Sequence, residues 1–451
     1  MKDITIQSLD AALRGVFEAE VEGQVRRVLV PGAAPGDRLD VELVAVSQHH
    51  PRAHGQITAV HRRGDQFVAP PCPHAAPLRG RCGGCPAMHL SQSLRDRAKF
   101  EAATETLEPL GAQMSWHAAP QQQGYRNRSN FVVRRRDERV VLGSFAPRSN
   151  EVASMTGCLV VRPAVEVVHR RLEELLTAEN VPVHREEGAL RWVSIREAAG
   201  QVVVELIVRD DRASWIGAVV GKIARFDEVS GVGVSVNDEK TNAIRRGPTV
   251  IVEGQGTLVE RYGLVDLQIP PGAFAQLNVA VASRMYEQAR VWAGDAKVVW
   301  DLYCGIGGLG LNAVVGREGA KLWGLEEVAS AVDAARGNAE DAGIEAQFEV
   351  VDLGDPITLT ALQAPRGLTD PQAVMVNPPR KGMSTPLRNW LAENPMGAER
   401  VVYMSCDPGS FGRDARALID GGWQLREIEV HDMLPMTRHV EVLGIFSWDD
   451  P

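Results

Sequence analysis

A cysteine and a glutamate near the C-terminus have the residue types and context for covalent catalysis. Cys406 follows a hydrophobic run within Tyr403-Met404-Ser405-Cys406-Asp407-Pro408, and Glu441 ends the later segment His439-Val440-Glu441. A thiol at the end of a predicted strand, with a carboxylate available from a neighbouring strand, suits nucleophilic attack through sulfur combined with proton abstraction. The pair therefore predicts an enzyme that forms a covalent intermediate with its substrate.

A glycine-rich turn precedes that pair in the chain. Asp301-Leu302-Tyr303-Cys304-Gly305-Ile306-Gly307-Gly308 leaves a hydrophobic strand, and Gly305-x-Gly307-x-x-Gly310 fits a nucleotide-binding fingerprint. Glu326 ends the next predicted strand, where an acidic residue bonds ribose hydroxyls. The motif alone fits NAD, S-adenosylmethionine or a plain strand–helix turn. Asp301 favours the methyl donor, whose charged amino-acid moiety needs polar partners.

A proline-rich loop follows another predicted strand, 373–376. In Asn377-Pro378-Pro379-Arg380-Lys381-Gly382, an amide is followed by a stiff backbone. Open α/β sheets bind ligands at the carboxyl ends of their strands, which is where this loop begins. The loop is suited to presenting its amide and carbonyl groups to a planar base. A proline-terminated strand with a basic loop is the structural alternative.

Four of the six cysteines suggest a metal centre. Cys72, Cys82 and Cys85 form a Cys-x9-Cys-x2-Cys pattern, and Cys158 stands alone later. In a reducing compartment such spacing favours a metal over disulfides. Thiolates suit structural zinc, which His74 could join, or an iron–sulfur cluster. Residue chemistry does not separate these two, and unliganded cysteines remain a third reading.

Size and composition are those of a globular enzyme. The chain has 451 residues, 44% hydrophobic and 24% charged, which predicts ample core and roughly three domains of about 150 residues. No run approaches the ~18 apolar residues of a membrane span, and the first residues lack the order of a signal peptide. We expect a cytoplasmic monomer with no membrane or protein partner.

The net charge of −9 excludes a generally basic coat for nucleic acid, although a local patch suffices for phosphate contacts. One candidate patch runs from Tyr125 to Arg139. Its arginines are interleaved with Phe131 and Asn127, a combination suited to phosphate contacts and base stacking. A solvated strand pair is the alternative reading. The arginines are Arg126, Arg128, Arg134, Arg135, Arg136 and Arg139.

Hydrophobic patterning predicts three parts, in a multi-domain α/β chain. Residues 1–61 alternate apolar and polar residues around a Pro/Gly turn cluster, typical of a small β-barrel. Residues 62–270 form a central α+β domain that carries the cysteine cluster, with a helix over 94–110. Residues 271–451 alternate helices with short buried strands at 298–302, 322–325, 348–351, 373–376 and 401–404, which predicts a Rossmann-like, doubly wound parallel sheet.

Several motifs, in order, resemble those of the RNA uracil-C5 methyltransferases, which make 5-methyluridine in ribosomal or transfer RNA. The start, Leu29 to Asp37, resembles the TRAM domain, a small RNA-binding barrel. The resemblance covers nearly the whole chain. Its other motifs are the Cys-Gly-Gly-Cys cluster, Phe274-x-Gln276-x-Asn278, Asp301 to Gly305, Asn377 to Arg380, Ser405 to Pro408 and His439 to Glu441.

The resemblance implies a role for each motif. Cys406 would add to C6 of uracil, and Glu441 would remove the C5 proton after methyl transfer. The four cysteines Cys72, Cys82, Cys85 and Cys158 would hold a [4Fe-4S] cluster, which moves the expectation from zinc to iron–sulfur. S-adenosylmethionine would be bound by Gln276, Asp301, Tyr303, Gly305, Gly307, Glu326, Asp352 and Asn377.

Three positions depart from much of the family. Asn377 stands where an aspartate is common, and Asp407 stands where an asparagine or similar polar residue is common. The carboxylate of Asp407 is expected to raise the pKa of the neighbouring thiol. The gap between Cys72 and Cys82 is longer than usual, because 75–81 includes extra residues.

The predicted substrate is structured RNA, with 23S ribosomal RNA favoured and transfer RNA next. Two other classes stay open: an NAD-dependent reductase built on the glycine-rich turn, and a non-catalytic RNA-binding or redox-sensing iron–sulfur protein. A reductase would have no use for the Cys406 and Glu441 motifs.

Overall fold

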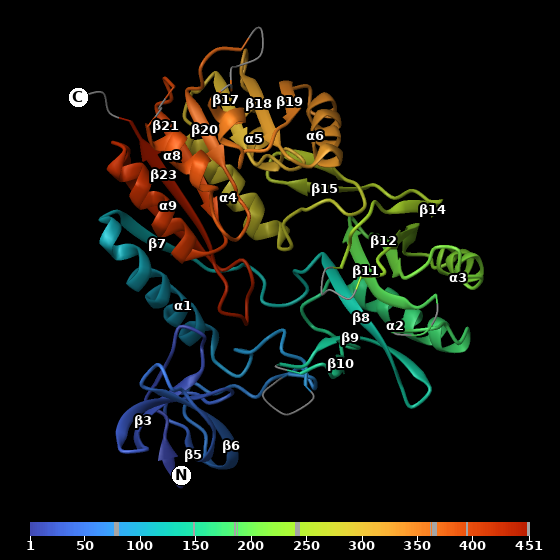
Figure 1. Ribbon diagram of the computed structural model, residues 1–451, viewed down its shortest axis with the longest axis vertical. Coiled ribbons are helices and arrows are strands. Elements are labelled where there is room, and N and C mark those ends of the chain that lie inside the picture. Colours follow the sequence, from blue (N-terminus) through green and yellow to red (C-terminus); the bar gives the residue numbers. More distant parts are fainter. Residues whose placement is uncertain are drawn as a thin grey trace. The chain divides into compact units, whose positions relative to one another are not determined.

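The computed structural model describes residues 1–75, 81–147, 149–184, 186, 188–239, 244–360, 362, 368–393 and 396–448. Contacts divide the chain into two compact units, coloured by sequence in Figure 1. The first comprises Met1–Glu105, Leu142–Cys158 and Leu434–His439. The second comprises Thr106–Val141, Leu159–Met433 and Val440–Pro451. These units do not coincide with the predicted ranges 1–61, 62–270 and 271–451, because segments distant in sequence pack together.

The first unit begins with a six-stranded sheet in the order β1-β5-β6-β4-β3-β2. Its alternating valines and leucines bury one face, where Val28, Val30 and Leu39 are fully enclosed, whereas Val25 is exposed. All neighbouring strands are antiparallel except β4 and β6. The strands are β1 (Ile4–Thr5), β2 (Ser8–Leu9), β3 (Gly15–Val21), β4 (Gln24–Val30), β5 (Arg38–Val46) and β6 (Arg52–Arg62).

Asp37 fixes the turn cluster between β4 and β5. Its carboxylate accepts hydrogen bonds from the Ala34 amide (3.0 Å) and the Gly64 amide (2.8 Å) and pairs with Arg63 at 2.7 Å. Gly64 lies so close to this turn that an added Cβ would meet the Pro35 carbonyl oxygen at 2.2 Å. The turn predicted from its prolines and glycines is therefore confirmed, and a buried carboxylate holds it.

The rest of the first unit consists of a helix and short extended segments. Helix α1 (Gln92–Leu107) and a following 3-10 turn (Glu108–Leu110) confirm the predicted helix. Strand β10 (Val152–Ser154) pairs with the end of β9 (Arg139–Phe145). Residues 434–439 belong to this unit because the Ala87 amide donates to the Met436 carbonyl at 3.0 Å, and Lys99 Nζ donates to two carbonyls of that loop.

The second unit contains five further strands in the order β8-β11-β12-β13-β14. Helix α2 (Pro163–Ala178) packs on β11 and β12, and helix α3 (Ile216–Ile223) packs on β13 and β14. A separate hairpin of β15 (Leu258–Tyr262) and β16 (Val265–Ile269) follows. The five strands are β8 (Arg128–Arg136), β11 (Leu190–Ala198), β12 (Gln201–Val208), β13 (Val229–Val236) and β14 (Val250–Gly254).

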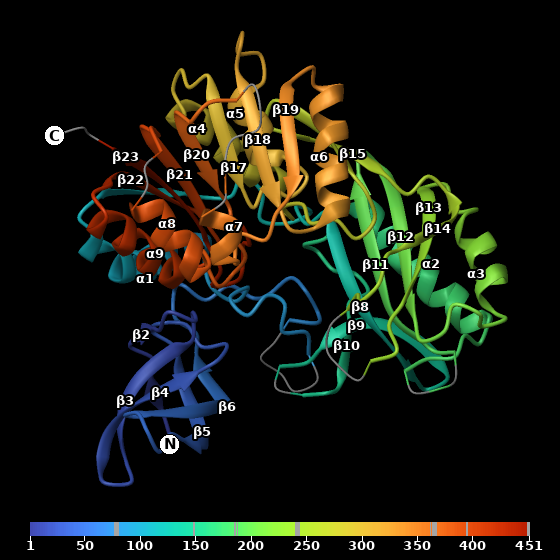
Figure 2. The ribbon, with the colours of Figure 1, turned by 45° about the horizontal axis from the view of Figure 1, so that its top comes forward.

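The predicted doubly wound sheet is present, with eight strands in the order β19-β18-β17-β20-β21-β23-β22-β7, most of them visible in Figure 2. The five strands from β19 to β21 are parallel. Strands β17, β18, β20 and β21 are deeply buried, as continuous hydrophobic runs predict, whereas the edge strand β19 is mostly exposed. The strands are β7 (Gln113–His117), β17 (Val298–Leu302), β18 (Lys321–Glu326), β19 (Glu345–Val350), β20 (Ala373–Val376), β21 (Arg400–Ser405), β22 (Gln424–His431) and β23 (Glu441–Ser447).

Strand order reverses between β17 and β20, which lie side by side although β18 and β19 come between them in sequence. Such a reversal is where doubly wound sheets bind ligands. The glycine-rich turn leaves β17 and the proline-rich loop leaves β20, so both predicted ligand motifs begin there. The helices are α4 (Val279–Trp292), α5 (Gly308–Val314), α6 (Ala329–Asp341), α7 (Pro356–Thr360), α8 (Thr385–Glu393) and α9 (Pro408–Asp420).

Among the described residues, no helix combines the length and the apolar composition that a membrane crossing requires.

Candidate active site

Strand pairing brings Cys406 and Glu441 together. Strands β21 and β23 are antiparallel, and Ser405 pairs with Val442. Cys406 directly follows Ser405, and Glu441 directly precedes Val442, so the two residues meet at the same end of this ladder. The charge of Glu441 acts on the Cys406 thiol accordingly. The structure thus places the predicted nucleophile beside the predicted base.

Glu441 is poised to exchange a proton near neutral pH. Its residue is 8% exposed, and burial raises the pKa of its carboxyl to about 8, while the charge of Arg380 opposes the rise. A general base works best when its pKa lies near the working pH. The environment of Glu441 therefore suits a carboxylate that takes a proton from a substrate carbon.

The surroundings of Cys406 favour its thiol form over the thiolate. Burial raises its pKa to about 11, with Glu441 adding to the rise and Arg380 opposing it. Asp407 raises the pKa as well, as the sequence predicted, but its effect is the weakest of the four charged or buried contributions. Burial and the charge of Glu441 therefore contribute more to the raised pKa of the thiol than Asp407 does.

Asp407 has a structural role at the start of α9. It is the N-cap residue, and its side-chain oxygen accepts a hydrogen bond from the Ser410 amide at 2.7 Å. Pro408 follows at the first helical position, where its missing N–H costs nothing. Aspartate and asparagine are equally good caps, so this departure from the family pattern preserves the helix start.

Arg380 acts electrostatically on both Cys406 and Glu441, although the sequence analysis quoted it without a role. It lies in the loop after β20, is exposed, and its charge favours the ionised forms of both Cys406 and Glu441. The Ser410 hydroxyl donates to its carbonyl oxygen at 3.0 Å, which ties this loop to α9. The signal available was the position of Arg380 after a strand that borders the strand-order reversal.

Asp301 supports the glycine-rich turn from below. It is fully buried, its Oδ2 accepts from the Gly310 amide at 2.8 Å, and a Cβ on Gly310 would approach this oxygen to 2.6 Å. Burial raises the pKa of Asp301 to about 7, with Glu326 adding to the rise. Its Oδ1 has no hydrogen-bond partner among the described residues. Asp301 therefore holds the turn and keeps one buried acceptor.

The turn itself has an unusual backbone. Tyr303 adopts a left-handed conformation (φ 63°), as do Gly305 (φ 55°) and Gly307 (φ 88°). Such a conformation is uncommon for an aromatic residue and marks local strain of the kind found at functional sites. A Cβ on Gly305 would meet nothing within 4 Å. The turn thus leaves open space at Gly305, as a ligand-binding backbone requires.

Glu326 lies at that same turn. It ends β18, is half-buried, and its carboxylate accepts hydrogen bonds from the Gly305 amide (3.1 Å) and the Val328 amide (3.0 Å). The hydroxyl of Tyr303 accepts from the Ser384 amide at 3.3 Å, which links the turn to the segment after the proline-rich loop. The predicted residues of this turn are therefore grouped by direct contacts.

The remaining predicted cofactor residues occupy three separate places. Asp352 is exposed just after β19 and accepts from the Gly354 amide at 2.7 Å. Asn377 is half-buried after β20, and its backbone amide donates to the Leu302 carbonyl at 3.3 Å. Strands β19, β18, β17 and β20 are neighbours, so these residues follow their carboxyl ends. No hydrogen bond between Asp352 and Asn377 is among those of the described residues.

Gln276 is held by its backbone. Its carbonyl accepts from the Tyr262 hydroxyl (2.7 Å) and the Asn127 side chain (3.1 Å), while its residue is 7% exposed. Nearby Phe274 is 62% exposed. Asn278 caps α4 and donates to the Met433 carbonyl at 3.1 Å. The motif Phe274-x-Gln276-x-Asn278 is thus a fixed loop with one exposed aromatic ring.

Two arginines of the two neighbouring strands β8 and β11 support this loop. Arg128 on β8, from the predicted basic patch, and Arg196 on β11 both donate to the Ala273 carbonyl, at 3.3 Å and 2.7 Å. Burial and the neighbouring arginines lower the pKa of Arg128 to about 9. Arg128 of the predicted patch therefore holds the loop that precedes Phe274, whereas Arg136 and Arg139 of the same patch are exposed.

The four predicted metal ligands lie in the first compact unit. All four are half-buried. His74 Nε2 contacts the Thr156 carbonyl at 2.9 Å, which ties the Cys72 segment to the turn of Cys158. Cys82 Sγ lies 3.3 Å from the Ser144 hydroxyl, and Gly83 packs on Pro147 so closely that a Cβ would stand 2.6 Å from Pro147 Cγ. Two segments distant in sequence, 72–85 and 144–158, therefore meet.

This donor set fits a sulfur-ligated group. Thiolates suit iron–sulfur clusters and zinc alike. His74 Nε2 lies 2.9 Å from the Thr156 carbonyl oxygen and would have to give up this contact to bind a metal. Of the segment 75–81 that lengthens the Cys72–Cys82 gap, residues 76–80 lie outside the described part of the chain.

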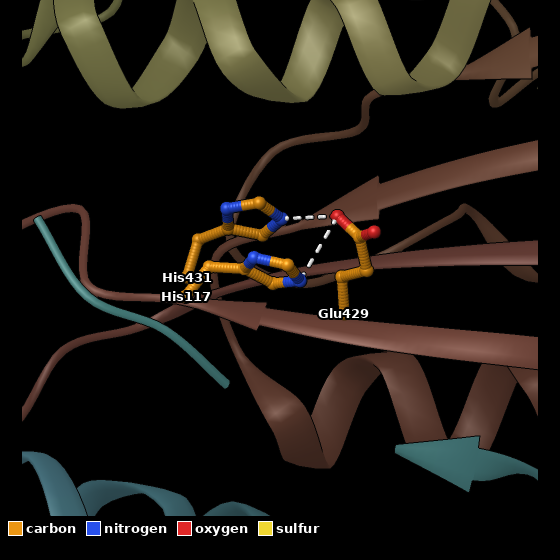
Figure 3. A group of neighbouring side chains, drawn as sticks. All are labelled: His117, Glu429 and His431. Carbon is orange, nitrogen blue, oxygen red and sulfur yellow. Dashed lines mark hydrogen bonds and ion pairs between the residues drawn. The ribbon is translucent and has the colours of Figure 1, made fainter. Parts of the chain in front are cut away.

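A second cluster of ligating side chains was not predicted. His117 ends β7, and Glu429 and His431 lie on the adjacent strand β22 (Figure 3). Glu429 Oε2 is 2.9 Å from His431 Nε2 and 3.4 Å from His117 Nε2. The two imidazoles are stacked, with ring centroids 4.6 Å apart. Sequence reasoning missed this group because β7 lies far from β22 in the chain and pairs with it only after folding.

Known proteins support the reading of the C-terminal motifs. Residues 261–447 match the family described as tRNA (uracil-5-)-methyltransferase. An uncharacterized RNA methyltransferase of Halalkalibacterium halodurans is 28% identical, over 99% of this chain and 96% of that protein. One from Clostridium tetani is 26% identical, over 93% and 91%. These matches indicate an S-adenosylmethionine-dependent RNA methyltransferase.

One solved structure shares the whole fold. The Pyrococcus abyssi tRNA (uracil-54, C5)-methyltransferase, solved with S-adenosyl-L-homocysteine, aligns with a TM-score of 0.76 at 23% identity. The alignment covers 98% of this chain and 100% of the Pyrococcus protein. The multi-domain α/β architecture predicted from the sequence is therefore confirmed.

Proposed function

We propose that this protein methylates C5 of a uridine in structured RNA, with Cys406 as nucleophile and Glu441 as base. The observation that carries the proposal is the pairing of β21 with β23, which sets a thiol beside a buried carboxyl whose pKa is raised to about 8. A reductase needs neither group. The donor is S-adenosylmethionine, and its bound methyl supplies the carbon that is transferred.

The reaction uses Cys406 first and Glu441 afterwards. Uracil C5 is a poor nucleophile until sulfur bonds to C6, because that addition moves an electron pair into the C5–C4–O4 enolate. C5 then bonds to the methyl carbon, and the bond from that carbon to the donor sulfur breaks. The ionised Glu441 takes the C5 proton, the C5=C6 double bond re-forms, and the C6–S bond breaks to release the Cys406 thiolate.

Arg380 favours both charged states that this sequence uses. Its positive charge opposes the pKa rise of Cys406 and of Glu441, so it stabilises thiolate and carboxylate alike. Uracil bound beside Cys406 would displace water and bring the C6 atom to the sulfur. Cys406 would pass its proton to solvent before it adds to C6, so that Glu441 stays ionised for the later removal of the C5 proton.

The donor site rests on the glycine-rich turn. There is open space beside Gly305. The Glu326 carboxylate accepts a hydrogen bond from the Gly305 amide, and the Asp301 carboxylate accepts one from the Gly310 amide. We assign Gln276, Tyr303, Gly307, Asp352 and Asn377 to the same site, because their motifs follow the carboxyl ends of adjacent strands or lie in the loop before α4. A ribose hydroxyl pair is the expected ligand of Glu326.

We further propose that a [4Fe-4S] cluster is held by Cys72, Cys82, Cys85 and Cys158. The N-terminal sheet would be a TRAM-like RNA-binding barrel. The protein would act in the cytoplasm as a monomer. The division into 1–61, 62–270 and 271–451 describes these roles. Ribosomal RNA is the favoured substrate, in particular 23S, with transfer RNA next. The Pyrococcus neighbour, a transfer RNA enzyme by its description, keeps both open.

The decisive experiment uses protein purified without oxygen, S-adenosylmethionine, and unmodified ribosomal and transfer RNA in parallel. Mass spectrometry of the digested nucleosides should show new 5-methyluridine in one RNA. RNA containing 5-fluorouridine should trap a covalent complex with Cys406, since C5 then carries no removable proton. Donor binding without either product would overturn the proposal and favour a non-catalytic RNA-binding protein, and nicotinamide binding would favour a reductase.

A further inference from the structure

We propose that His117, Glu429 and His431 form a binding site for one Zn²⁺ ion, separate from the cysteine cluster and from the methyl-transfer site. We call these three residues the His-Glu-His group. The inference is independent of the proposed methylation, because it depends only on the local geometry of two strands.

The sheet itself places the three ligands. Strands β7 and β22 are parallel, and His117 pairs with His431 in their register. Glu429 is two residues before His431, and side chains two apart on a strand project from the same face. The whole group is therefore fixed by regular backbone pairing, which gives a more exact ligand geometry than loops do.

The ligand atoms converge on a small volume. Both imidazole Nε2 atoms face the same carboxylate oxygen, at 2.9 Å and 3.4 Å, and all three ligand atoms lie within 4.8 Å of one another. Figure 3 shows both Nε2 atoms on the side of the carboxylate. Zn²⁺ with bonds of about 2.0–2.1 Å separates tetrahedral ligand atoms by roughly 3.4 Å. Modest ring rotations would reach that arrangement.

The three side chains are largely shielded from water. Relative side-chain exposure is 16% for His117, 11% for Glu429 and zero for His431. Buried polar and charged groups need partners, and a metal ion bound by all three side chains would supply one.

The identity of the ion follows from the donor atoms. Two imidazoles and a carboxylate suit zinc and similar transition ions, whereas Mg²⁺ and Ca²⁺ prefer oxygen ligands only. Three protein ligands leave a fourth position for water. Three features weaken the site. The positive charge of Arg284 acts on all three groups, the Ser115 hydroxyl lies 3.0 Å from His117 Nε2 and would have to give up that contact, and His431 Nδ1 has no hydrogen-bond partner within the described ranges. Without a hydrogen-bond partner for the second ring nitrogen of a ligating histidine, the affinity for the metal is lower by about 10–100-fold.

The site would join the edge strand to the catalytic sheet. His431 pairs with Glu441 across β22 and β23, so a metal linking His431 to His117 would fasten β7 against the strand that neighbours the proposed base. Its role would be structural, because Glu429 and the imidazoles are engaged with one another rather than with the thiol. Cofactor and RNA chemistry would proceed without a step on the ion.

The test is a titration of anaerobically purified protein with Co²⁺, which replaces Zn²⁺ and is coloured. Nitrogen and oxygen ligation gives visible d–d bands without thiolate-to-metal charge transfer, whereas binding to cysteines adds that transfer band. We expect one equivalent with the first signature in the wild type and in Cys82→Ser. Glu429→Gln and His117→Gln should lose this equivalent.

Glu427→Gln is the matched control, because Glu427 lies on the same strand, is exposed and is outside the group. It should bind as the wild type does. Equal Co²⁺ binding by Glu429→Gln and Glu427→Gln would overturn the proposal and leave two histidines sharing a hydrogen-bonded carboxylate. If the ligand variants fail to fold, X-ray absorption of wild-type protein with one Zn²⁺ decides, since scattering by sulfur alone would equally overturn it.

Discussion

The two sulfur sites of this protein are held in place by different means. Cys406 lies at the end of a buried strand, and its partner Glu441 lies on the neighbouring strand, so backbone ladders set their separation. Cys72, Cys82 and Cys158 lie in turns that are linked by contacts such as His74 to Thr156 and Cys82 to Ser144. The first site is positioned by the core, and the second by a few loop contacts.

That difference predicts different responses to damage. A site set by sheet pairing keeps its geometry when one side chain is changed, because the ladder does not depend on that side chain. A site set by loops owes part of its order to the ligand that binds there. Variants at Cys406 and Glu441 should therefore lose chemistry while keeping the fold, whereas variants at the cysteine cluster should lose order first.

The largest effect is expected from Cys406→Ala. Removing the nucleophile leaves C5 without activation, so formation of 5-methyluridine should fall by at least about 10³-fold. Thermal stability and binding of S-adenosylmethionine should stay close to wild type, because Cys406 ends a strand whose pairing is backbone-only. Substantial methylation by Cys406→Ala would refute covalent catalysis.

Glu441→Gln should slow the reaction at a later step. Loss of a general base costs typically 10²–10⁴-fold, and the adduct with Cys406 should accumulate because elimination follows proton removal. Electrophoresis of the protein with RNA detects that adduct. Stability provides a second readout: the folded pKa, about 8, lies above the usual 4.5, so the wild type loses stability as pH rises between these values. The variant should lack that loss.

Sequence reasoning located the parts of the site that depend on local order. The strand ends carrying Asp301, Asn377 and Cys406 were predicted because buried parallel strands are short hydrophobic runs followed by turns. The sequence did not predict which strands pair with one another across the sheet. The meeting of His117 with Glu429, and the effect of Arg380 on two groups at once, depend on neighbours that only the folded chain supplies.

Roles within a predicted motif were also only partly readable. Asp301 is fully buried and bonds the Gly310 amide, which no spacing rule reveals. Asp407 was expected to raise the pKa of the thiol, and it does so weakly, while its side chain caps α9. In both cases the carboxylate serves a backbone amide first, because unpaired amides at turns and helix starts are costly.

Arg380→Met should move the pH profile of methylation. In the wild type the rate should rise through about pH 8, as Glu441 ionises. Without the positive charge, the pKa of Glu441 and of Cys406 both rise further, so the rising limb moves to higher pH. If the pKa of Glu441 is higher by about one, the rate at pH 7 should fall about tenfold. An unchanged profile with a lower plateau would instead assign Arg380 to RNA binding, and Lys381→Met is the adjacent control.

Cys158→Ser should separate the two sulfur sites. We expect loss of the iron content and of the cluster absorbance, together with a lower midpoint of thermal unfolding. Covalent capture of 5-fluorouridine RNA by Cys406 should persist within about tenfold, equivalent to about 1.4 kcal/mol, because the β21–β23 ladder does not involve these turns. Ser154→Ala, in the same segment, is the control. Loss of capture with the fold intact would mean that the cluster is required for the methyl-transfer site.

The smallest effect is expected from Asp407→Ala. The variant loses the bond from the Ser410 amide to the cap, which should reduce the free energy of unfolding by about 1 kcal/mol. Asp407→Asn keeps an oxygen acceptor and should retain that stability. Both changes remove a negative charge beside Cys406, so each should lower the thiol pKa slightly. Denaturant unfolding measures the first effect, and the rate of thiol alkylation against pH measures the second. If Asp407→Asn were as unstable as Asp407→Ala, the carboxylate would stabilise the fold through its charge rather than as a helix cap. The position of Cys406 would then depend on the start of α9 as well as on the pairing of β21 with β23.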